Sequence, residues 1–140
     1  MNNQLSRVCM VLLACLSVFQ TVSAETIRIR VLNGHNGKPV AHEKVSLYIR
    51  GEKGALDYIT DINGTFTVNL DPSTALLPST EWWITCRTVN PTAPHLFSVD
   101  SIHNEGATDE NNCGKAKSEI IRGTLTIFAR KASFFENMAR

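Results

Sequence analysis

The sequence lacks an excess of charge of either sign. Its 140 residues include 14 Lys or Arg and 13 Asp or Glu, which gives a formal net charge of +1 at pH 7. Proteins that hold the phosphate backbone of nucleic acids usually present a strongly basic surface, so this balance excludes a nucleic-acid binder. Internal repeats and low-complexity tracts are also missing, and the length predicts a single domain.

Long hydrophobic runs are missing as well. The longest apolar stretch, Val8–Phe19, has 12 residues, whereas a transmembrane helix needs about 20. It follows Arg7 and precedes the small residues at positions 22–24. A positive charge, a short apolar run and small residues are the pattern of a secretory signal peptide. We therefore expect residues 1–24 to be a signal peptide and predict no transmembrane segment after its removal.

Cleavage is expected between Ala24 and Glu25, which leaves a neutral mature domain of residues 25–140 with a secreted or periplasmic location. A second interpretation rests on Leu12–Cys15, which resembles the lipobox of bacterial lipoproteins, with Cys15 as the lipidated residue. Leu13 stands where a smaller residue is usual, and the apolar run continues beyond Cys15. Plain secretion is therefore favoured over lipidation.

Cysteine is scarce in the expected mature domain. Of the 4 cysteines, Cys9 and Cys15 lie in the predicted signal, which leaves Cys86 and Cys113. No CxxC spacing is present and no histidine flanks either residue, so a redox or metal pair is disfavoured. An even pair in a small exported domain predicts a disulfide. Such a bridge would stabilise the fold by about 3–4 kcal/mol on the chain-entropy estimate.

Motifs for catalysis and metal binding are absent from the sequence. It contains no HExxH, no His-x-His and no Gly-x-Ser-x-Gly element, so we predict no catalytic residue, no metal site and no cofactor. Histidines are expected in loops or at element ends: His35, His42, His95 and His103. Three acidic neighbours are interpreted as solvated charges of a polar loop: Glu105, Asp109 and Glu110.

Alternation of apolar and polar residues dominates the first half of the mature domain and predicts β-strands. Strands are expected near residues 27–31, 45–50, 55–60, 65–70, 81–88 and 124–130. The Asp61–Gly64 segment contains Asn-Gly, which favours a type I′ hairpin turn between two of these strands. Residues 71–80 are expected to form a loop. Short helices are predicted from Ser98 to about Glu105, capped by Ser98 and ended by Gly106, and over Ala132–Met138.

Several of these segments resemble the carboxypeptidase regulatory-like domains, which are transthyretin-like (prealbumin-like) β-sandwiches. The resemblance lies in Val31–Asn33, Gly37–Val40, Val45–Leu47 and Thr60–Phe66, within about residues 26–70. Asn112–Gly114 and the segment from Gly123 to Met138 are similar to stand-alone exported bacterial members. The resemblance implies an antiparallel seven-stranded Greek-key β-sandwich of transthyretin/Ig-like topology. The two short helices, one before Cys113 and one at the C-terminus, would be additions to it.

One enzyme class shares this architecture, and two of its marks are missing. Hydroxyisourate hydrolases carry a His-Val-Leu-Asp segment in the first strand and end in Tyr-Arg-Gly-Ser. The matching segment here is Arg30–Asn33, with arginine in place of the histidine, and the last four residues are 137–140, Asn-Met-Ala-Arg. The resemblance therefore implies a fold rather than this activity.

Adjacent tryptophans are the most informative remaining feature. In a strand, Trp82 and Trp83 must point to opposite faces, so only one can enter the main core. We favour burial of the other under the C-terminal helix, by Phe134, Phe135 and Met138; the alternative is an exposed platform for sugar rings.

The sequence therefore predicts an exported, non-catalytic module with a binding or structural role in the cell envelope or medium, with an unidentified protein or carbohydrate partner. Two alternatives stay open. One is a carbohydrate-binding module with an exposed aromatic face at Trp82 or Trp83. The other is a small hydrolase whose residues converge only in three dimensions. A pocket that gathers His or carboxylate side chains would favour the hydrolase, and a flat aromatic face would favour sugar binding.

Overall fold

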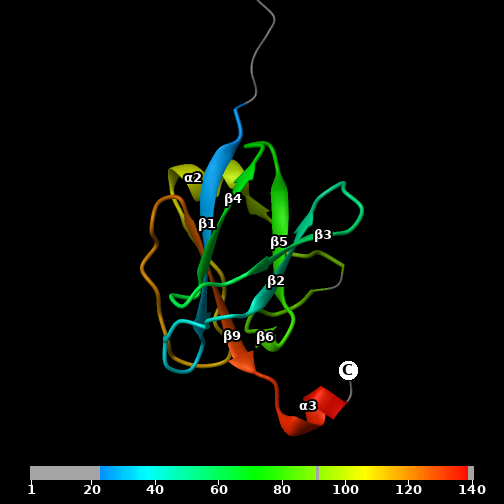
Figure 1. Cartoon of the computed structure of the whole chain (residues 1–140), viewed down its shortest axis with the longest axis vertical. Helices are drawn as coiled ribbons and strands as arrows, with labels where there is room; N and C mark the ends of the chain where they lie inside the picture. Colours follow the sequence, from blue (N-terminus) through cyan, green and yellow to red (C-terminus); the bar gives the residue numbers. More distant parts are fainter. Residues whose placement is uncertain (1–22, 91, 139–140) are drawn as a thin grey trace, which may run out of the picture.

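Two β-sheets and two short helices form the part of the chain that the computed structural model describes, residues 23–90 and 92–138 (Figure 1). This mostly-β architecture confirms the predicted fold class at the level of two sheets with short helices. Nine strand segments are present in the described residues, and two of them are only 2 residues long.

The first sheet has five strands in the order β4–β1–β9–β6, with β8 paired to β9 off this path. Their bounds are Glu25–Asn33 for β1, Thr65–Leu70 for β4, Trp83–Thr85 for β6, Ala107–Thr108 for β8 and Thr124–Lys131 for β9. The second sheet has the order β3–β2–β5–β7 and is antiparallel throughout. Its strands are Lys44–Ile49 for β2, Ala55–Ile59 for β3, Ala75–Thr80 for β5 and Phe97–Ser98 for β7.

Apolar side chains from both sheets share one core, which is the packing of a sandwich. Ile27, Ile29 and Val31 of β1 are 0% exposed, as the alternation in the sequence predicts. Val45 and Leu47 of β2, in the other sheet, belong to the same cluster. Burial of these two inward faces against each other is the main source of stability in such an architecture.

Strand pairing differs from the antiparallel arrangement that we expected. β1 runs parallel to β9, with Arg28 beside Thr124 and Asn33 beside Ala129, and β8 also runs parallel to β9. Parallel neighbours need a long crossover between them, and nearly the whole domain lies between β1 and β9. Apolar and polar residues alternate in the same way in parallel and in antiparallel strands, so this pattern does not predict the direction in which β1 and β9 pair.

The Asp61–Gly64 turn also differs from the prediction. Gly64 has φ +71° but Asn63 does not have a positive φ, which excludes a type I′ turn. The Asp61 carboxylate accepts hydrogen bonds from the backbone N–H groups of Asn63 and Thr65, at 2.9 and 2.8 Å. The flanking strands β3 and β4 then enter different sheets, so the turn connects the two layers.

The segment expected to be a loop contains a strand. β5 pairs with β2 over Val45–Ile49, and Pro78 lies opposite Leu47 within that ladder. Its carbonyl accepts a hydrogen bond from Arg87, which lies outside the sheet. Because the N and O atoms of one strand residue face the same side, the missing N–H of Pro78 points away from β2 and interrupts no ladder bond.

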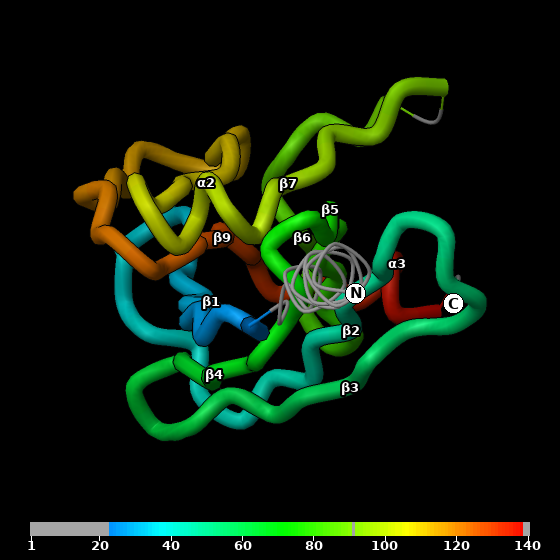
Figure 2. Tube along the Cα trace, turned by 90° about the horizontal axis from the view of Figure 1, so that it is seen from above, coloured from blue at the N-terminus to red at the C-terminus, as the bar shows by residue number. Residues whose placement is uncertain are grey.

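Both short helices are confirmed. α2 spans Val99–Asn104, with Ser98 as its N-cap, and Val99 and Ile102 are buried in the core. α3 spans Phe134–Met138 beyond the end of β9. Seen from above, the residues around 87–90 and 92–96 extend away from the sheets (Figure 2). In the same view α2 lies beside β1 and β9.

The predicted signal peptide lies almost wholly outside the described residues. Ala24 immediately precedes β1 and Glu25 begins it, so the predicted cleavage position falls where the regular structure starts. Within residues 23–90 and 92–138, no helix has the length and apolar character required to cross a bilayer.

Candidate functional site

Trp82 and Trp83 are placed by a buried carboxylate. Glu43 is 1% exposed, and its Oε1 accepts hydrogen bonds from the backbone N–H groups of Trp82 and Trp83, at 2.8 and 3.0 Å. Burial raises the pKa of Glu43, and these backbone hydrogen bonds oppose that rise. The carboxylate therefore fixes the backbone at the point where β6 begins, and with it the direction of both indoles.

Only one tryptophan packs against the core, as predicted, but β6 is shorter than the expected strand over residues 81–88, and Trp82 precedes it instead of alternating with Trp83 within it. Trp83 packs against the core cluster, and Lys131 Nζ lies 5.9 Å from the centre of its ring. Trp82 is 54% exposed. Burial of the second indole by the C-terminal helix is a wrong prediction, because the apolar residues of α3 are themselves exposed: Phe134, Phe135 and Met138. Trp82 is thus a single exposed indole, which supplies one ring rather than a continuous aromatic face.

The predicted disulfide is confirmed. Cys86 and Cys113 are bonded, with their Cα atoms 5.2 Å apart. Gly34 lies against this bridge, since a Cβ atom there would approach Cys86 Sγ to 2.8 Å and Asn111 Oδ1 to 2.5 Å. Asn111 Nδ2 in turn donates to the carbonyls of Gly34 and Ala116, both at 2.8 Å. The bridge therefore attaches the 109–118 segment closely to the first sheet.

Next to this bridge in the chain lies a cavity of about 260 Å³ lined by residues with polar side chains, which we call the Asp109 cavity. Its lining comes from three separate segments: Arg87, Thr88, His95, Thr108, Asp109 and Glu110. Arg87 directly follows Cys86, His95 precedes β7, and Asp109 directly follows β8. Only the folded chain brings these residues together.

A buried ion pair forms one wall of the Asp109 cavity. Arg87 Nη1 lies 3.2 Å from Asp109 Oδ2, and the side chains are 8% and 3% exposed. Asp109 Oδ1 accepts from the backbone N–H of Glu110 at 2.9 Å, and a second guanidinium nitrogen of Arg87 donates to the carbonyl of Pro78. Burial raises the pKa of Asp109, and the nearby charge of Arg87 opposes the rise. The pair links the 87–88 and 108–110 segments to β5 of the other sheet.

The remaining groups of the cavity have unused hydrogen-bonding capacity. Thr108 Oγ1 is buried and has no hydrogen-bond partner among residues 23–90 and 92–138. Glu110 and His95 are exposed, and within the described part of the chain the one hydrogen bond to the Glu110 carboxylate comes from Asn112 Nδ2, at 3.3 Å. His95 contacts the ring of Phe97 edge-on, with centroids 4.8 Å apart. Buried polar atoms usually have partners, so the unpaired hydroxyl of Thr108 is an unsatisfied group in the wall between this cavity and a neighbouring concave region that Thr108 also lines.

Asp109 corrects the interpretation of Glu105, Asp109 and Glu110 as solvated loop charges. Glu105 and Glu110 are exposed, but Asp109 is 7% exposed and paired. A usable signal was present in the sequence. Arg87 follows one predicted disulfide cysteine and Asp109 lies four positions before the other, so the bridge itself brings the two charges close.

The four histidines do not meet. His35 and His42 lie in turns of the segment between β1 and β2, His95 lines the Asp109 cavity, and His103 is in the last turn of α2. Across residues 23–90 and 92–138, no group of three or more His, Cys, Asp and Glu side chains is arranged to hold a metal ion.

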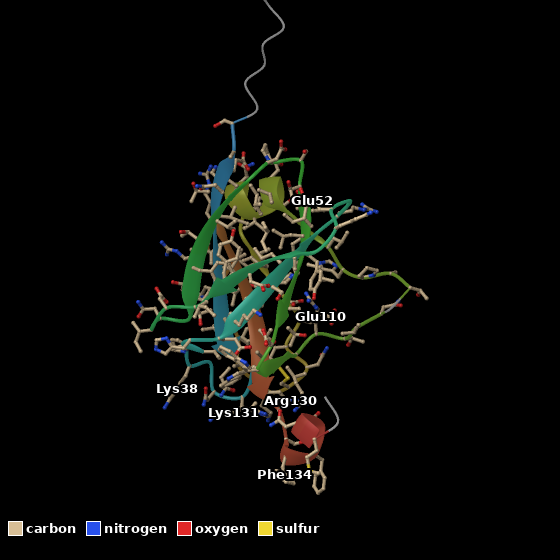
Figure 3. The ribbon with its side chains drawn as sticks, turned by 45° about the vertical axis from the view of Figure 1, so that its right-hand side comes forward. Lys38, Glu52, Glu110, Arg130, Lys131 and Phe134 are labelled. Atoms are coloured by element: carbon tan, nitrogen blue, oxygen red, sulfur yellow. A yellow bond between two sulfur atoms is a disulfide. The ribbon has the colours of Figure 1, made fainter. Side chains whose placement is uncertain are left out.

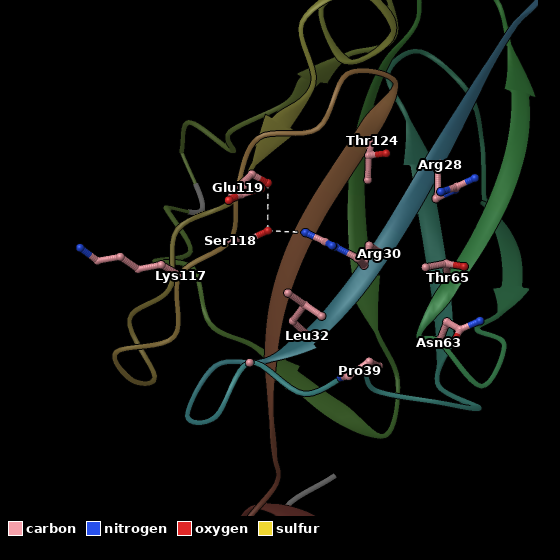
Figure 4. Close-up of a pocket in the computed structure, with 11 residues that line it drawn as sticks. Arg28, Arg30, Leu32, Pro39, Asn63, Thr65, Lys117, Ser118, Glu119 and Thr124 are labelled. Carbon is pink, nitrogen blue, oxygen red and sulfur yellow. Dashed lines mark hydrogen bonds between the residues drawn. The ribbon is translucent and has the colours of Figure 1, made fainter.

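A second concave region lies over the outer face of the first sheet. Its volume is about 530 Å³, and β1 contributes Arg28 and Arg30 to it (Figure 4).

Comparison of the chain with protein-family models and with curated proteins finds no match in either case. The functional conclusion therefore rests on the residues and their geometry.

Proposed function

We propose that the protein is an exported, non-catalytic binding module with a carboxypeptidase regulatory-like, transthyretin-like β-sandwich fold of Greek-key type. Two sheets with a shared apolar core and a disulfide support this proposal. A disulfide is typical of secreted and periplasmic proteins. Its role would be recognition in the cell envelope or medium rather than chemistry.

The ligand that fits the Asp109 cavity best is a neutral, hydroxyl-rich group such as a terminal sugar of a carbohydrate. The observation that carries this proposal is the meeting of His95, Thr108 and Glu110 with the Arg87–Asp109 pair in one concave site. The lining mixes donors and acceptors, and a sugar hydroxyl can donate to one and accept from the other. Small-molecule sites are typically concave, with a few convergent polar groups.

A glycan array with the purified protein, followed by titration calorimetry, tests this function. Thr108→Val keeps the side-chain shape and removes the hydroxyl, so it should weaken binding of the selected glycan roughly tenfold. Trp82→Ala is the matched control, because that indole is exposed outside the cavity. Equal affinity of wild type and Thr108→Val, with loss of binding in Trp82→Ala, would instead place the sugar on the exposed indole.

Export is proposed with cleavage between Ala24 and Glu25. The mass of the protein recovered from the medium or periplasm distinguishes the alternatives directly. A product that begins at Glu25 supports plain secretion, whereas a lipid-modified product that begins at Cys15 supports the lipoprotein. An unprocessed chain in the cytoplasm, with Cys86 and Cys113 reduced, contradicts export.

A small hydrolase is the second candidate, because the cavity gathers His95, Asp109 and Glu110. Within the described residues no hydrogen bond joins His95 to Asp109, whose oxygens are bound to Arg87 and to the Glu110 N–H. A catalytic base is normally oriented by such a bond, so binding is favoured over hydrolysis. Turnover of an ester or glycoside panel that disappears in His95→Ala would reverse this preference.

A further inference from the structure

The outer face of the first sheet carries two arginines set between threonines. Along β1, Arg28 and Arg30 alternate with the buried isoleucines and so point outward. Arg28 lies between Thr67 of β4 and Thr124 of β9. Arg30 lies between Thr65 of β4 and Thr126 of β9. Each arginine therefore has hydroxyl-bearing neighbours on both sides, and neither has a carboxylate opposite it in the sheet.

Arg30 is held in place by hydroxyl groups rather than by an acid. Its Nε donates to Thr126 Oγ1 at 3.3 Å, and one of its terminal nitrogens donates to Ser118 Oγ. The Ser118 hydroxyl in turn donates a hydrogen bond to the carbonyl of Glu119 at 3.0 Å (Figure 4). Neutral partners orient a guanidinium without cancelling its charge, so Arg30 keeps its positive charge at a fixed position.

The backbone N–H of Arg28 donates to the carbonyl of Gly123 at 2.8 Å, but its side chain has no hydrogen bond or ion pair with any residue of 23–90 and 92–138 and is exposed. The charge of Arg28 acts on Asp61, whose pKa is lowered first by its hydrogen bonds from Thr65 and least by Arg28. The Asp61 carboxylate already accepts three hydrogen bonds from its own turn. Arg28 therefore has its donors available for a ligand.

These residues line the cavity of about 530 Å³ on this face, which we call the β1 groove. Asn63, Thr65 and Thr124 add polar side chains to its lining. The lining includes one acidic residue, Glu119, and three basic residues, which are Arg28, Arg30 and Lys117. The Lys117 side chain extends away from the two arginines (Figure 4). The groove is thus locally positive in a protein whose total charge is close to neutral.

We propose that the β1 groove binds an acidic saccharide, with Arg28 and Arg30 on its oxyanion groups and the threonine and asparagine side chains on its hydroxyls. A guanidinium presents its N–H donors as a fork that matches a carboxylate, sulfate or phosphate. The groove is larger than a single inorganic anion requires and lies in the size range of small-molecule sites. This site is separate from the Asp109 cavity and does not depend on the function proposed for it.

Calorimetric titration of the purified protein with an oligogalacturonate tests the site. The methyl ester of the same oligosaccharide serves as the uncharged control ligand, and inorganic sulfate and phosphate serve as free-anion probes. We expect the acid form to bind, its affinity to fall with added salt, and its methyl ester to bind at least tenfold more weakly.

Arg28→Gln is the decisive variant, because within the described residues the Arg28 guanidinium makes no hydrogen bond or ion pair, and the substitution leaves the backbone hydrogen bond to Gly123 in place. It should weaken oligogalacturonate binding about tenfold, as expected for one charge-assisted hydrogen bond, and Arg28→Gln/Arg30→Gln should weaken it further. Arg50→Gln, an exposed arginine of the turn after β2, is the charge-matched control and should leave affinity unchanged. Thermal unfolding of each variant checks that the fold is intact.

Three results would overturn the proposal. They are equal binding of the acid and its methyl ester, equal effects of Arg28→Gln and Arg50→Gln, or binding of sulfate or phosphate without any binding of oligogalacturonate. If Thr108→Val loses neutral-glycan binding but binds oligogalacturonate as wild type does, the proposal for the β1 groove is supported as an independent site. Loss of oligogalacturonate binding in Thr108→Val, with Arg28→Gln inert, would move the acidic ligand to the Asp109 cavity.

Discussion

At the residue scale, the pair formed by Arg87 and Asp109 shows how a costly interaction can be retained. Both side chains are almost fully buried, and removal of two charges from water carries a large desolvation penalty. The compensation is that Asp109 accepts from Arg87 and from a backbone N–H, while Arg87 also reaches the carbonyl of Pro78 in the other sheet. Removal of one partner of such a pair destabilises the protein more than replacement of both partners by apolar residues does.

Arg87→Met should therefore destabilise the protein by about 3–5 kcal/mol, because it leaves Asp109 buried without a counter-charge. The double variant Arg87→Met/Asp109→Leu should recover most of that loss. Urea unfolding of wild type and both variants measures the effect. Lys44→Met, which breaks the solvent-accessible ion pairs of Lys44 with Asp57 and Glu81, should change stability far less. A double variant as unstable as Arg87→Met would show that the pair contributes through more than its charges.

The residues of the Asp109 cavity could be only partly predicted from the sequence. The disulfide brings Arg87 and Asp109 together, and that bridge was predicted from cysteine parity. His95 comes from an irregular segment before β7, and no periodicity fixes where such a segment lies. The unpartnered state of Thr108 Oγ1 depends on the absence of neighbouring donors in three dimensions, which no local pattern encodes.

At the element scale, α3 has no buried residue, and its main contact with β9 is the ion pair between Arg130 and Glu136. Its apolar residues are exposed, and Phe134 lies at the far end of the molecule, beyond Arg130 and Lys131 (Figure 3). Arg130 binds Glu136 through two hydrogen bonds of 2.8 and 2.6 Å, and Glu136 Oε2 also accepts from the Ser133 N–H at 2.7 Å. These contacts, with Arg130 first, lower the pKa of Glu136 far below its ordinary value.

Glu136→Gln should therefore unfold α3 at neutral pH while the sheets stay intact. In wild type, a lowered folded-state pKa means that the stabilisation is present above the ordinary pKa of glutamate, about 4.3, and is lost as the pH falls further toward the folded value. Backbone chemical shifts of residues 134–138 between pH 7 and pH 2 measure this transition. Glu119→Gln, which changes an exposed carboxylate elsewhere, should leave these shifts unchanged; a helical signal that persists in Glu136→Gln would contradict the model of a charge-held helix.

A strand could be predicted from the sequence where its buried residues alternate with exposed ones. Ile27, Ile29 and Val31 fall on one buried face, as the pattern indicates. β5 was missed because Pro78 argues against a strand, and its tolerance depends on which side of the ladder the missing N–H faces. The direction of β9 relative to β1 was also missed, since pairing between distant strands leaves no mark in the local sequence.

At the scale of the whole molecule, the Cys86–Cys113 bridge fastens the long segment between α2 and β9. This segment contributes only β8, of 2 residues, to the first sheet and is otherwise irregular. It nevertheless supplies Asp109 and Glu110 to the Asp109 cavity and Ser118 and Glu119 to the β1 groove. Both proposed sites therefore depend on one covalent constraint.

Removal of the bridge, by reduction or by Cys86→Ala/Cys113→Ala, should lower the free energy of unfolding by about 3–4 kcal/mol, because the cysteines are 27 positions apart and the bridge restricts the unfolded chain accordingly. Urea unfolding of oxidised, reduced and doubly substituted protein measures the change, and the last two should agree. At low denaturant, amide exchange should rise first in residues 109–118, while the N–H groups of β1 and β2 stay protected by the apolar core. Coincident unfolding curves for the oxidised and reduced protein would show that Gly34 and Asn111 hold the segment without the bridge.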